Sequence, residues 1–361
     1  MAEPTPAPGT LIEDLETPVV TVDLDVMAGN IRKMQAYCDE HGLNFRPHVK
    51  THKIPKIAAM QLEAGARGIT CQKLGEAEIF AEAGCDDIFI PYNLLGAPKL
   101  KRLMALTHLA RMSVAADSAT TVQGLSDAAA AAGREVSVLI ECDTGAGRTG
   151  VQTPEQALEL ARLIDRSPGL RFGGLMVFPT QPESTPAFLE AALGLLAKAG
   201  LEAETVSGGG TPQTWRTHEV PQLTEHRAGT YVYNDTNTMA AGTATLAECA
   251  MRVQMTVASH PTEDRAILDG GSKTLSADRL LWRDPFYGTV VEYPDAAIYA
   301  YSEEHANVDL SRCTSKPVVG ERVTVIPNHC CTVSNLHNHI LGVREGRVET
   351  VWPVAARGLV R

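Results

Sequence analysis

Short apolar runs rich in β-branched residues alternate with segments of helical periodicity over the first two thirds of the chain. The helical segments are rich in Ala, Leu, Glu and Lys and include 53–64, 74–83, 98–109 and 154–165. The apolar runs predict eight strands, at 44–50, 68–73, 87–92, 111–117, 136–143, 172–180, 204–208 and 226–233. A doubly wound open sheet would give a similar pattern. The even spacing and the number of units favour an α/β fold of the (β/α)₈ TIM-like barrel type.

The alternation of strand-like and helical segments stops after about residue 239. Short β-branched runs separated by Gly, Pro or Asp follow at 250–259, 265–268, 288–293, 322–326, 339–343 and 348–354. They predict a second, antiparallel β domain, which the strand-like run 17–23 is expected to join. We therefore expect an N-terminal tail and strand at 1–25, the barrel at 26–240 and the C-terminal β domain at 241–361.

Composition narrows the choice of partners and compartment. A net charge of −11 over 361 residues argues against nucleic acid or an anionic membrane, although a small anionic ligand stays open. No apolar run approaches the ~20 residues of a membrane span. The first ten residues lack the basic and apolar regions of a signal peptide and are expected to form a short flexible tail. Eight irregularly spaced cysteines suit a reducing cytoplasm.

Polar residues gather where the predicted strands end, which is the face that carries the active site in barrel enzymes. The segment 46–53 combines two lysines, two histidines and an arginine. A lysine desolvated among other cations has a lowered pKa and can form a Schiff base with a substrate ketone or with pyridoxal phosphate. Lys50, which ends the first predicted strand, is the candidate. A basic surface turn is the alternative.

A second candidate site follows the seventh predicted strand. Its residues combine hydroxyl donors with a backbone that can approach an anion closely: Ser207, Gly208, Gly209, Gly210 and Thr211. The next strand brings Gly229 and Tyr231, which could complete the cup. The spacing is not that of a P-loop, and a plain tight turn is the alternative.

A third candidate lies in the β domain. On a strand, residues i and i+2 share a face, so His329 and Cys331 could bind one metal ion while Cys330 points away. Imidazole and thiolate suit Zn²⁺, whereas Mn²⁺ or Mg²⁺ would prefer a carboxylate in place of the sulfur. The alternative is a buried cysteine beside a hydrogen-bonded histidine. His337 and His339 are additional candidate ligands, but they are expected to face solvent.

Taken in order, the motifs resemble the D-threonine aldolase and D-serine dehydratase family of pyridoxal phosphate (PLP) enzymes, which have the alanine racemase fold. The matching segments are R-P-H-V-K-T-H-K at 46–53, G-I-T-C-Q-K at 68–73, D-T-G-A-G-R-T-G-V at 143–151, S-G-G-G-T-P at 207–212, R-A-G-T-Y at 227–231, D-G-G-S-K at 269–273, P-N-H-C-C at 327–331 and W-P-V-A-A-R-G at 352–358. They span nearly the whole chain.

The resemblance implies a role for each candidate. Lys50 would be the Schiff-base lysine, and Gln72 and Arg148 would flank the cofactor ring. The loop 207–211 with Gly229 and Tyr231 would hold the phosphate. His329 and Cys331 would bind a divalent metal (Zn²⁺, Mn²⁺ or Mg²⁺) beside the substrate's β-hydroxyl. The resemblance also implies a homodimer.

One departure concerns the catalytic base. Relatives carry a histidine just after strand six, whereas this chain has V-F-P-T-Q-P at 177–182, so His52 is the nearest sequence alternative. The resemblance implies a lyase that cleaves D-β-hydroxy-α-amino acids, with D-threonine aldolase as first choice. A D-serine or 3-hydroxy-D-aspartate dehydratase, a non-catalytic PLP-homeostasis protein and a cofactor-free aldolase using Lys50 are the alternatives.

Overall fold

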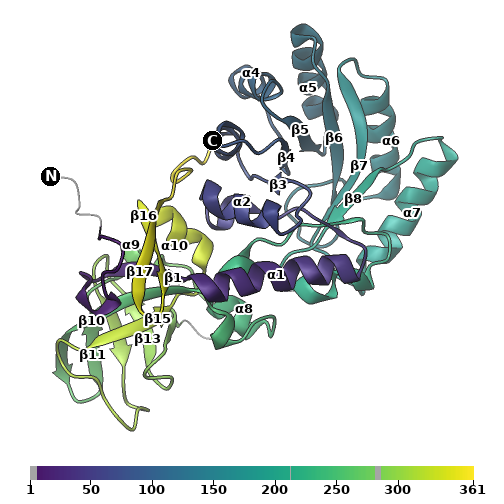
Figure 1. Cartoon of the computed structure of the whole chain (residues 1–361). Helices are drawn as coiled ribbons and strands as arrows, with labels where there is room; N and C mark the ends of the chain where they lie inside the picture. Colours follow the sequence, from purple (N-terminus) through teal and green to yellow (C-terminus); the bar gives the residue numbers. More distant parts are fainter. Residues whose placement is uncertain (1–5, 212, 281–285) are drawn as a thin grey trace. The chain divides into compact units, whose positions relative to one another are not determined.

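The computed structural model describes residues 6–211, 213–280 and 286–361, and the chain forms two compact units (Figure 1). The barrel unit comprises Lys33–Lys50, Pro55–Gly229 and Leu359–Arg361. The β unit comprises Met1–Arg32, Thr51–Ile54 and Thr230–Gly358. Pro212 of the matched 207–212 motif, and residues 1–5 of the predicted tail, lie outside the described residues.

Eight parallel strands form the centre of the barrel unit, in the order β2-β9-β8-β7-β6-β5-β4-β3. They are β2 Asn44–Phe45, β3 Ile69–Thr70, β4 Asp87–Ile90, β5 Arg111–Ala116, β6 Val136–Asp143, β7 Leu170–Phe178, β8 Thr205–Gly208 and β9 Glu225–His226. A parallel bridge between His48 and Thr70 joins the two ends of this order. The predicted (β/α)₈ barrel is confirmed.

Helices follow the strands in the expected alternation: α2 Pro55–Glu63, α3 Leu74–Glu82, α4 Ala97–Leu106, α5 Ala119–Ala132, α6 Pro154–Asp165 and α7 Thr185–Lys198. Helix α6 illustrates the local signals that start a helix and orient its buried face. Thr153 caps it by accepting a hydrogen bond from the Gln156 backbone N–H, and Pro154 sits at its first position. Its buried residues recur at helical spacing: Ala157, Leu160, Ala161 and Ile164.

The barrel interior combines an apolar layer with buried charges. Phe89, Ala115, Leu139 and Met176 come from four neighbouring strands and pack together. Arg46 is 8% exposed and forms ion pairs of 2.7 Å with Glu225 and 2.6 Å with Asp87. Burial alone would lower the pKa of Arg46, but these two carboxylates raise it. The guanidinium therefore stays charged and satisfied inside the barrel.

The β unit is a mostly antiparallel sheet. Its strands are β1 Val19–Asp23, β10 Met251–Thr262, β11 Arg265–Leu268, β12 Thr289–Val290, β13 Ala297–Tyr301, β14 Ala306–Asp309, β15 Arg322–Ile326, β16 His339–Arg344 and β17 Arg347–Pro353. The main path runs β13-β14-β11-β10-β1-β16-β17, and β15 pairs with β10 and β12. As predicted, the N-terminal strand joins this sheet. Its pairing with β16 is parallel, so the sheet is mixed rather than purely antiparallel.

Short helices complete the β unit: α8 Thr236–Ala240, α9 Ser272–Leu275 and α10 Cys330–Leu336. Helix α1, Leu24–Glu40, begins in this unit, and its residues from Lys33 onward belong to the barrel unit. A small core forms under the N-terminal segment from Leu15, Leu341, Val343 and Val348.

Three sequence expectations need correction. The strand expected over 44–50 ends at Phe45 and is followed by a 3-10 turn at Val49–Thr51, since Pro47 has no N–H to give to a ladder. The strand expected over 226–233 likewise ends at His226 and is followed by a 3-10 turn, Thr230–Val232. The predicted flexible tail is wrong for Gly9 and Thr10, which form backbone hydrogen bonds with Val348.

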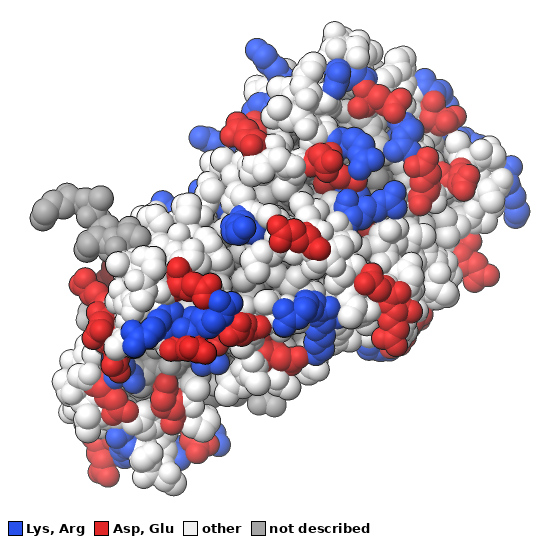
Figure 2. All heavy atoms as spheres, in the orientation of Figure 1, with Lys and Arg blue, Asp and Glu red and all other residues white. Residues whose placement is uncertain are grey.

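The surface carries both charge signs. Lys and Arg side chains lie among Asp and Glu side chains on the face shown in Figure 2. Arg216, for example, lies 2.9 Å from Glu183 and 2.7 Å from Glu219. Within the part of the chain that the structure describes, no helix is both long and apolar enough to cross a membrane.

Candidate active site

Lys50 and Lys53 have different environments. Lys50 is half-buried in the 3-10 turn after β2, so it does not end the strand as expected. Lys53 is 5% exposed and precedes α2, with a left-handed φ of 56°. Its Nζ donates to Asn335 Oδ1 at 2.9 Å and to the Ala356 carbonyl at 3.3 Å. The amine of Lys53 is therefore held by structural contacts.

A buried histidine lies two residues before Lys50. His48 is 7% exposed, and its Nε2 lies 3.0 Å from Gln72 Oε1. Burial lowers the pKa of His48 well below its usual value, and the charges of Lys50 and Arg227 lower it further. The imidazole is therefore neutral. The Gln72 amide oxygen can only accept, so His48 Nε2 donates this hydrogen bond. The bond fixes the orientation of the Gln72 side chain.

The Gly-rich loop 207–211 has a packed part, whose residues are buried against the barrel, and an open part, where a side chain would find space. Ser207 Oγ donates to Glu225 Oε1 at 2.6 Å and accepts from Arg227 Nε at 2.7 Å, so it is engaged inside the barrel. The Gly209 N–H donates to Thr180 Oγ1 at 2.7 Å.

The open part begins at Gly210. A Cβ added at Gly209 would lie 2.0 Å from His226 Nδ1, whereas one at Gly210 would meet nothing nearer than Phe178 at 3.7 Å. A Cβ at Gly208 would approach Thr180 Oγ1 to 2.8 Å, so this residue too belongs to the packed part. The space beside the loop is therefore at Gly210 and the half-buried Thr211 that follows it.

Arg148 belongs to a turn organised by a carboxylate. Asp143 Oδ1 accepts hydrogen bonds from the backbone N–H groups of Gly145 and Ala146. The Arg148 guanidinium lies 4.7 Å from the Phe178 ring centre and 3.9 Å from Glu141 Oε1, and its side chain is 59% exposed. Arg148 is thus available to a ligand.

The other predicted residues are placed as follows. Gly229 is the last residue of the second barrel segment and Tyr231, 4% exposed, lies in the β unit. His52 is fully buried, and its Nδ1 accepts a hydrogen bond from the Ile54 N–H at 3.1 Å. That nitrogen is therefore committed to the backbone and does not serve as a free base.

His329 and Cys331 do not lie on a strand. Strand β15 ends at Ile326, His329 is the N-cap of α10, and Cys331 lies in the first turn of that helix. The argument from strand alternation is therefore wrong. The two side chains are nevertheless hydrogen-bonded to each other. The turn into the helix, rather than a pleat, brings them together.

Neighbouring groups hold this pair. His329 Nδ1 lies 3.2 Å from Asp235 Oδ2, and Cys331 Sγ lies 3.2 Å from Thr51 Oγ1. The negative charge of Cys331 raises the pKa of His329 to about 11, against the effect of burial. The pKa of Cys331 is lowered well below its usual value by hydrogen bonding from Cys330 and by the His329 charge, although burial opposes this. Burial raises the pKa of Cys330, which stays a thiol.

This chemistry fits a divalent metal. A thiol whose pKa is lowered and an imidazole are donors that a divalent metal accepts, and the contact of His329 Nδ1 with Asp235 leaves Nε2 to face a ligand. Within residues 6–211, 213–280 and 286–361, no cluster of three His, Cys, Asp or Glu side chains is placed to hold a metal ion.

Thr180 and Asp235 are among the polar residues expected at the ends of the predicted strands, but sequence reasoning assigned them no supporting role, and it assigned none to Thr51. Asp235 had a local signal, because it stands three residues before Thr238 in a capping-box pattern at the start of α8. Its contact with His329 joins residues 94 apart in sequence and had no signal.

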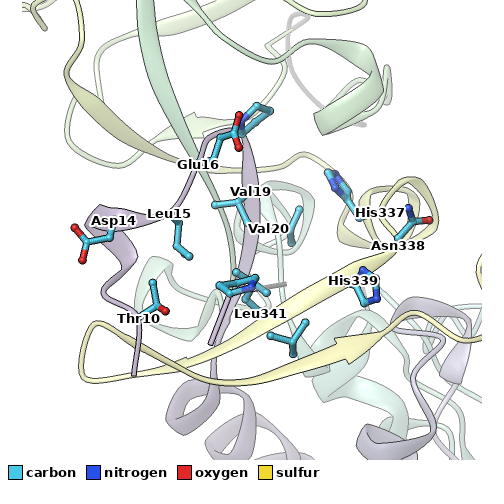
Figure 3. A pocket seen from close by; sticks show the side chains of 13 residues that line it. Thr10, Asp14, Leu15, Glu16, Val19, Val20, His337, Asn338, His339 and Leu341 are labelled. Atoms are coloured by element: carbon cyan, nitrogen blue, oxygen red, sulfur yellow. The ribbon is translucent and has the colours of Figure 1, made fainter. Parts of the chain in front are cut away.

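A separate pocket of about 300 Å³ lies in the β unit (Figure 3). Leu15, Val19 and Leu341 give it apolar walls, and His337 and His339 lie at one side (Figure 3). As expected, His339 is exposed, but His337 is half-buried and its Nε2 lies 3.0 Å from the Thr274 carbonyl. None of the residues predicted to bind cofactor or metal lines this pocket.

Comparison with known proteins gives the family. The family model of the alanine racemase N-terminal domain matches residues 22–237, and a serine dehydratase domain model matches residues 250–343. The chain is 35% identical to a D-threonine aldolase of Arthrobacter sp., over 100% of this chain and 98% of that protein. It is 34% identical to the D-threo-3-hydroxyaspartate dehydratase of Delftia sp., over 88% of this chain and 91% of the relative.

The fold comparison agrees. The crystal structure of D-threonine aldolase from Filomicrobium marinum superposes with a TM-score of 0.89 and 31% identity, covering 99% of this chain and 100% of the other. The sequence match, the shared fold and the two matched domains lead to one conclusion. The chain belongs to the D-threonine aldolase and D-serine dehydratase family of PLP enzymes with the alanine racemase fold.

Proposed function

We propose that the protein is a PLP- and divalent-metal-dependent lyase that cleaves D-β-hydroxy-α-amino acids, with the D-threonine aldolase reaction as its activity. The observation that carries the proposal is the pair His329 and Cys331, a thiolate and an oriented imidazole in a turn of the second domain. A non-catalytic PLP carrier has no use for such a pair. The 35% identity to a D-threonine aldolase over the full chain supports the choice of reaction.

In this proposal the barrel unit binds the cofactor. PLP, when bound, supplies an electron sink for the bond broken at Cα. Lys50 would hold it covalently, and the substrate amine would displace that lysine. Gln72, held by His48, and Arg148 would flank the ring, while Gly210 and Thr211 would face the phosphate. Ser207, Gly208 and Gly209 would hold the backbone of this loop in place. Gly229, which follows β9, and Tyr231, in the next 3-10 turn, would complete the phosphate site.

The β unit would supply the second function. His329 and Cys331 would hold a divalent ion of the Zn²⁺ class, which as a Lewis acid favours loss of the β-hydroxyl proton. Thr51 keeps the Cys331 sulfur in a polar contact at 3.2 Å. Loss of that proton with cleavage of Cα–Cβ would release acetaldehyde from D-threonine, and addition of a proton at Cα would give glycine.

A dehydratase is the second candidate, favoured by the 34% identity to the Delftia enzyme. It would remove the Cα proton and expel the hydroxyl, giving a 2-oxo acid and ammonia. The two reactions differ in the proton that a base must remove: the β-hydroxyl proton in the aldolase reaction and the Cα proton in the dehydratase reaction. No histidine stands at 177–182, and the committed Nδ1 of His52 leaves that residue a weak candidate for the base.

Family membership also supports a homodimer, a cytoplasmic location and a small D-amino acid as the partner, which we include in the proposal. Light scattering of the holoenzyme measures the oligomeric state. A single species at twice the 38.7 kDa chain mass is expected. A monomer that is fully active would contradict this part.

The reverse reaction tests the choice of activity. We expect the holoenzyme with Mn²⁺ or Zn²⁺ to condense glycine with acetaldehyde into 2-amino-3-hydroxybutanoate of D configuration at Cα, measured by chiral chromatography. A dehydratase has no route to this product. Absence of condensation, together with ammonia release from D-serine or D-3-hydroxyaspartate, would make the dehydratase the correct function.

A further inference from the structure

Asp235 carries two sets of contacts in the β unit. It is fully buried and is the N-cap of α8, where Oδ1 accepts from the Thr238 N–H at 2.9 Å. Its other oxygen, Oδ2, lies 3.2 Å from His329 Nδ1 and accepts from the Cys330 N–H at 3.1 Å. The second set reaches the turn that carries the proposed metal ligands.

The cap alone does not require an aspartate. Ser, Thr, Asn and Asp all cap helices well through one oxygen. A carboxylate here buries a second oxygen, which is costly unless it is hydrogen-bonded. Its hydrogen bonds go to His329 and Cys330. The extra oxygen therefore serves this turn and not the helix.

We propose that Asp235 is the positioning residue of the metal centre: it accepts the Nδ1 proton of His329, presents Nε2 to the ion, and fixes the backbone that places Cys331. The inference rests on the proposed function. A carboxylate behind a metal-bound histidine sets both the ring orientation and the nitrogen that carries the proton. The Cys330 N–H contact adds a backbone restraint one residue before Cys331.

Two substitutions separate this role from helix capping. Asp235→Ser keeps a capping hydroxyl but is too short to reach His329. Asp235→Asn keeps the size, but one amide oxygen cannot accept from Thr238, Cys330 and His329 together. Its NH₂ group must face a donor or force the proton of His329 onto Nε2. Both variants should weaken metal binding by about 10- to 100-fold.

Thr238→Ala is the matched control. The Thr238 hydroxyl accepts from the Asp235 N–H at 2.8 Å and donates to the Asp235 carbonyl at 2.8 Å. Its removal weakens the cap of α8 without touching Oδ2. We expect lower thermal stability and a metal dissociation constant that stays within about twofold of wild type.

The measurement is Zn²⁺ affinity of the full-length, PLP-loaded protein by chelator competition, with unfolding followed by circular dichroism. Weakened Zn²⁺ binding in Asp235→Ser and Asp235→Asn, but not in Thr238→Ala, supports the inference. Wild-type affinity in Asp235→Ser would overturn it, as would an equal loss in Thr238→Ala. If wild type binds no Zn²⁺ and no Mn²⁺, the metal part of the proposed function fails with it. If Asp235→Asn misfolds, Asp235→Ser alone decides.

Discussion

The substitution Gly209→Ala should damage the fold more than the cofactor site. Gly209 has a φ of +92°, and an added Cβ would lie 2.0 Å from His226 Nδ1 and 2.6 Å from its Cε1. His226 is fully buried and its Nδ1 lies 3.0 Å from Thr217 Oγ1. The imidazole has to move, and its contact with Thr217 is lost.

Three terms set the size of the effect. A left-handed backbone costs a non-glycine residue about 1–2 kcal/mol. Overpacking a core costs about 1–3 kcal/mol, and an unsatisfied buried polar group costs about 1–3 kcal/mol. We expect Gly209→Ala to lower the free energy of unfolding by roughly 3–8 kcal/mol, a large part of the roughly 5–15 kcal/mol that stabilises a typical protein.

Gly210→Ala is the comparison. Its added Cβ meets Phe178 at an ordinary 3.7 Å, so only the backbone term at a φ of +139° applies, about 1–3 kcal/mol. The new methyl group enters the open part of the loop. Gly210→Ala should therefore stay folded and bind PLP more weakly.

Urea unfolding without PLP, followed by circular dichroism, measures both variants. Fluorescence titration of the folded protein gives the PLP dissociation constant. If Gly209→Ala unfolds at the same urea concentration as Gly210→Ala, the close contact with His226 does not set the stability of this loop. Unchanged PLP affinity in Gly210→Ala would place the phosphate elsewhere.

Three further predictions concern single side chains. Borohydride reduction of the holoenzyme should place the phosphopyridoxyl label on Lys50; a label on Lys53 in the peptide map would show the assignment to be wrong. Burial, helped by the charge of Arg227, lowers the pKa of His226 to about 3, so its contribution to stability is present above pH ~6.5 and is lost as pH falls from there toward 3. Relative to His226→Gln, wild type should lose up to about 1.4 kcal/mol per pH unit in that window, and parallel urea midpoints at pH 7, 6 and 5 would contradict this. Cys331→Ala should abolish Zn²⁺ binding with the PLP absorption intact, whereas the buried Cys330→Ala keeps Zn²⁺ at a packing cost; the opposite pattern in metal analysis would exchange the two roles.

Much of the fold could be predicted from sequence because its signals are local. The strand expected over 136–143 and the helix over 154–165 have those bounds in the structure, since a buried parallel strand and an amphipathic helix each have a clear period. The strand-like run at 17–23 corresponds to β1, which pairs with β10 and β16. The strands predicted at 44–50 and 226–233 are too long, because each short strand leads into a 3-10 turn.

The candidate site was only partly predictable. The chemistry of Lys50, His329 and Cys331 can be inferred from residue type and order. The geometry that joins His329 to Cys331 was inferred wrongly, because a turn into α10 and a strand give the same spacing in sequence. The long-range contact of Asp235 with His329 depends on tertiary packing, which has no period in the sequence.

The products of D-threonine cleavage decide between the two candidate activities and show whether a metal is needed. The PLP-loaded enzyme would be incubated with D-threonine or L-threonine, with and without added Mn²⁺ or Zn²⁺ after chelator treatment. We expect one glycine and one acetaldehyde per D-threonine consumed, and no cleavage of L-threonine. Turnover should be lost after metal removal and should return when metal is added back. Release of 2-oxobutanoate and ammonia, or turnover unaffected by verified metal removal, would contradict the proposed function.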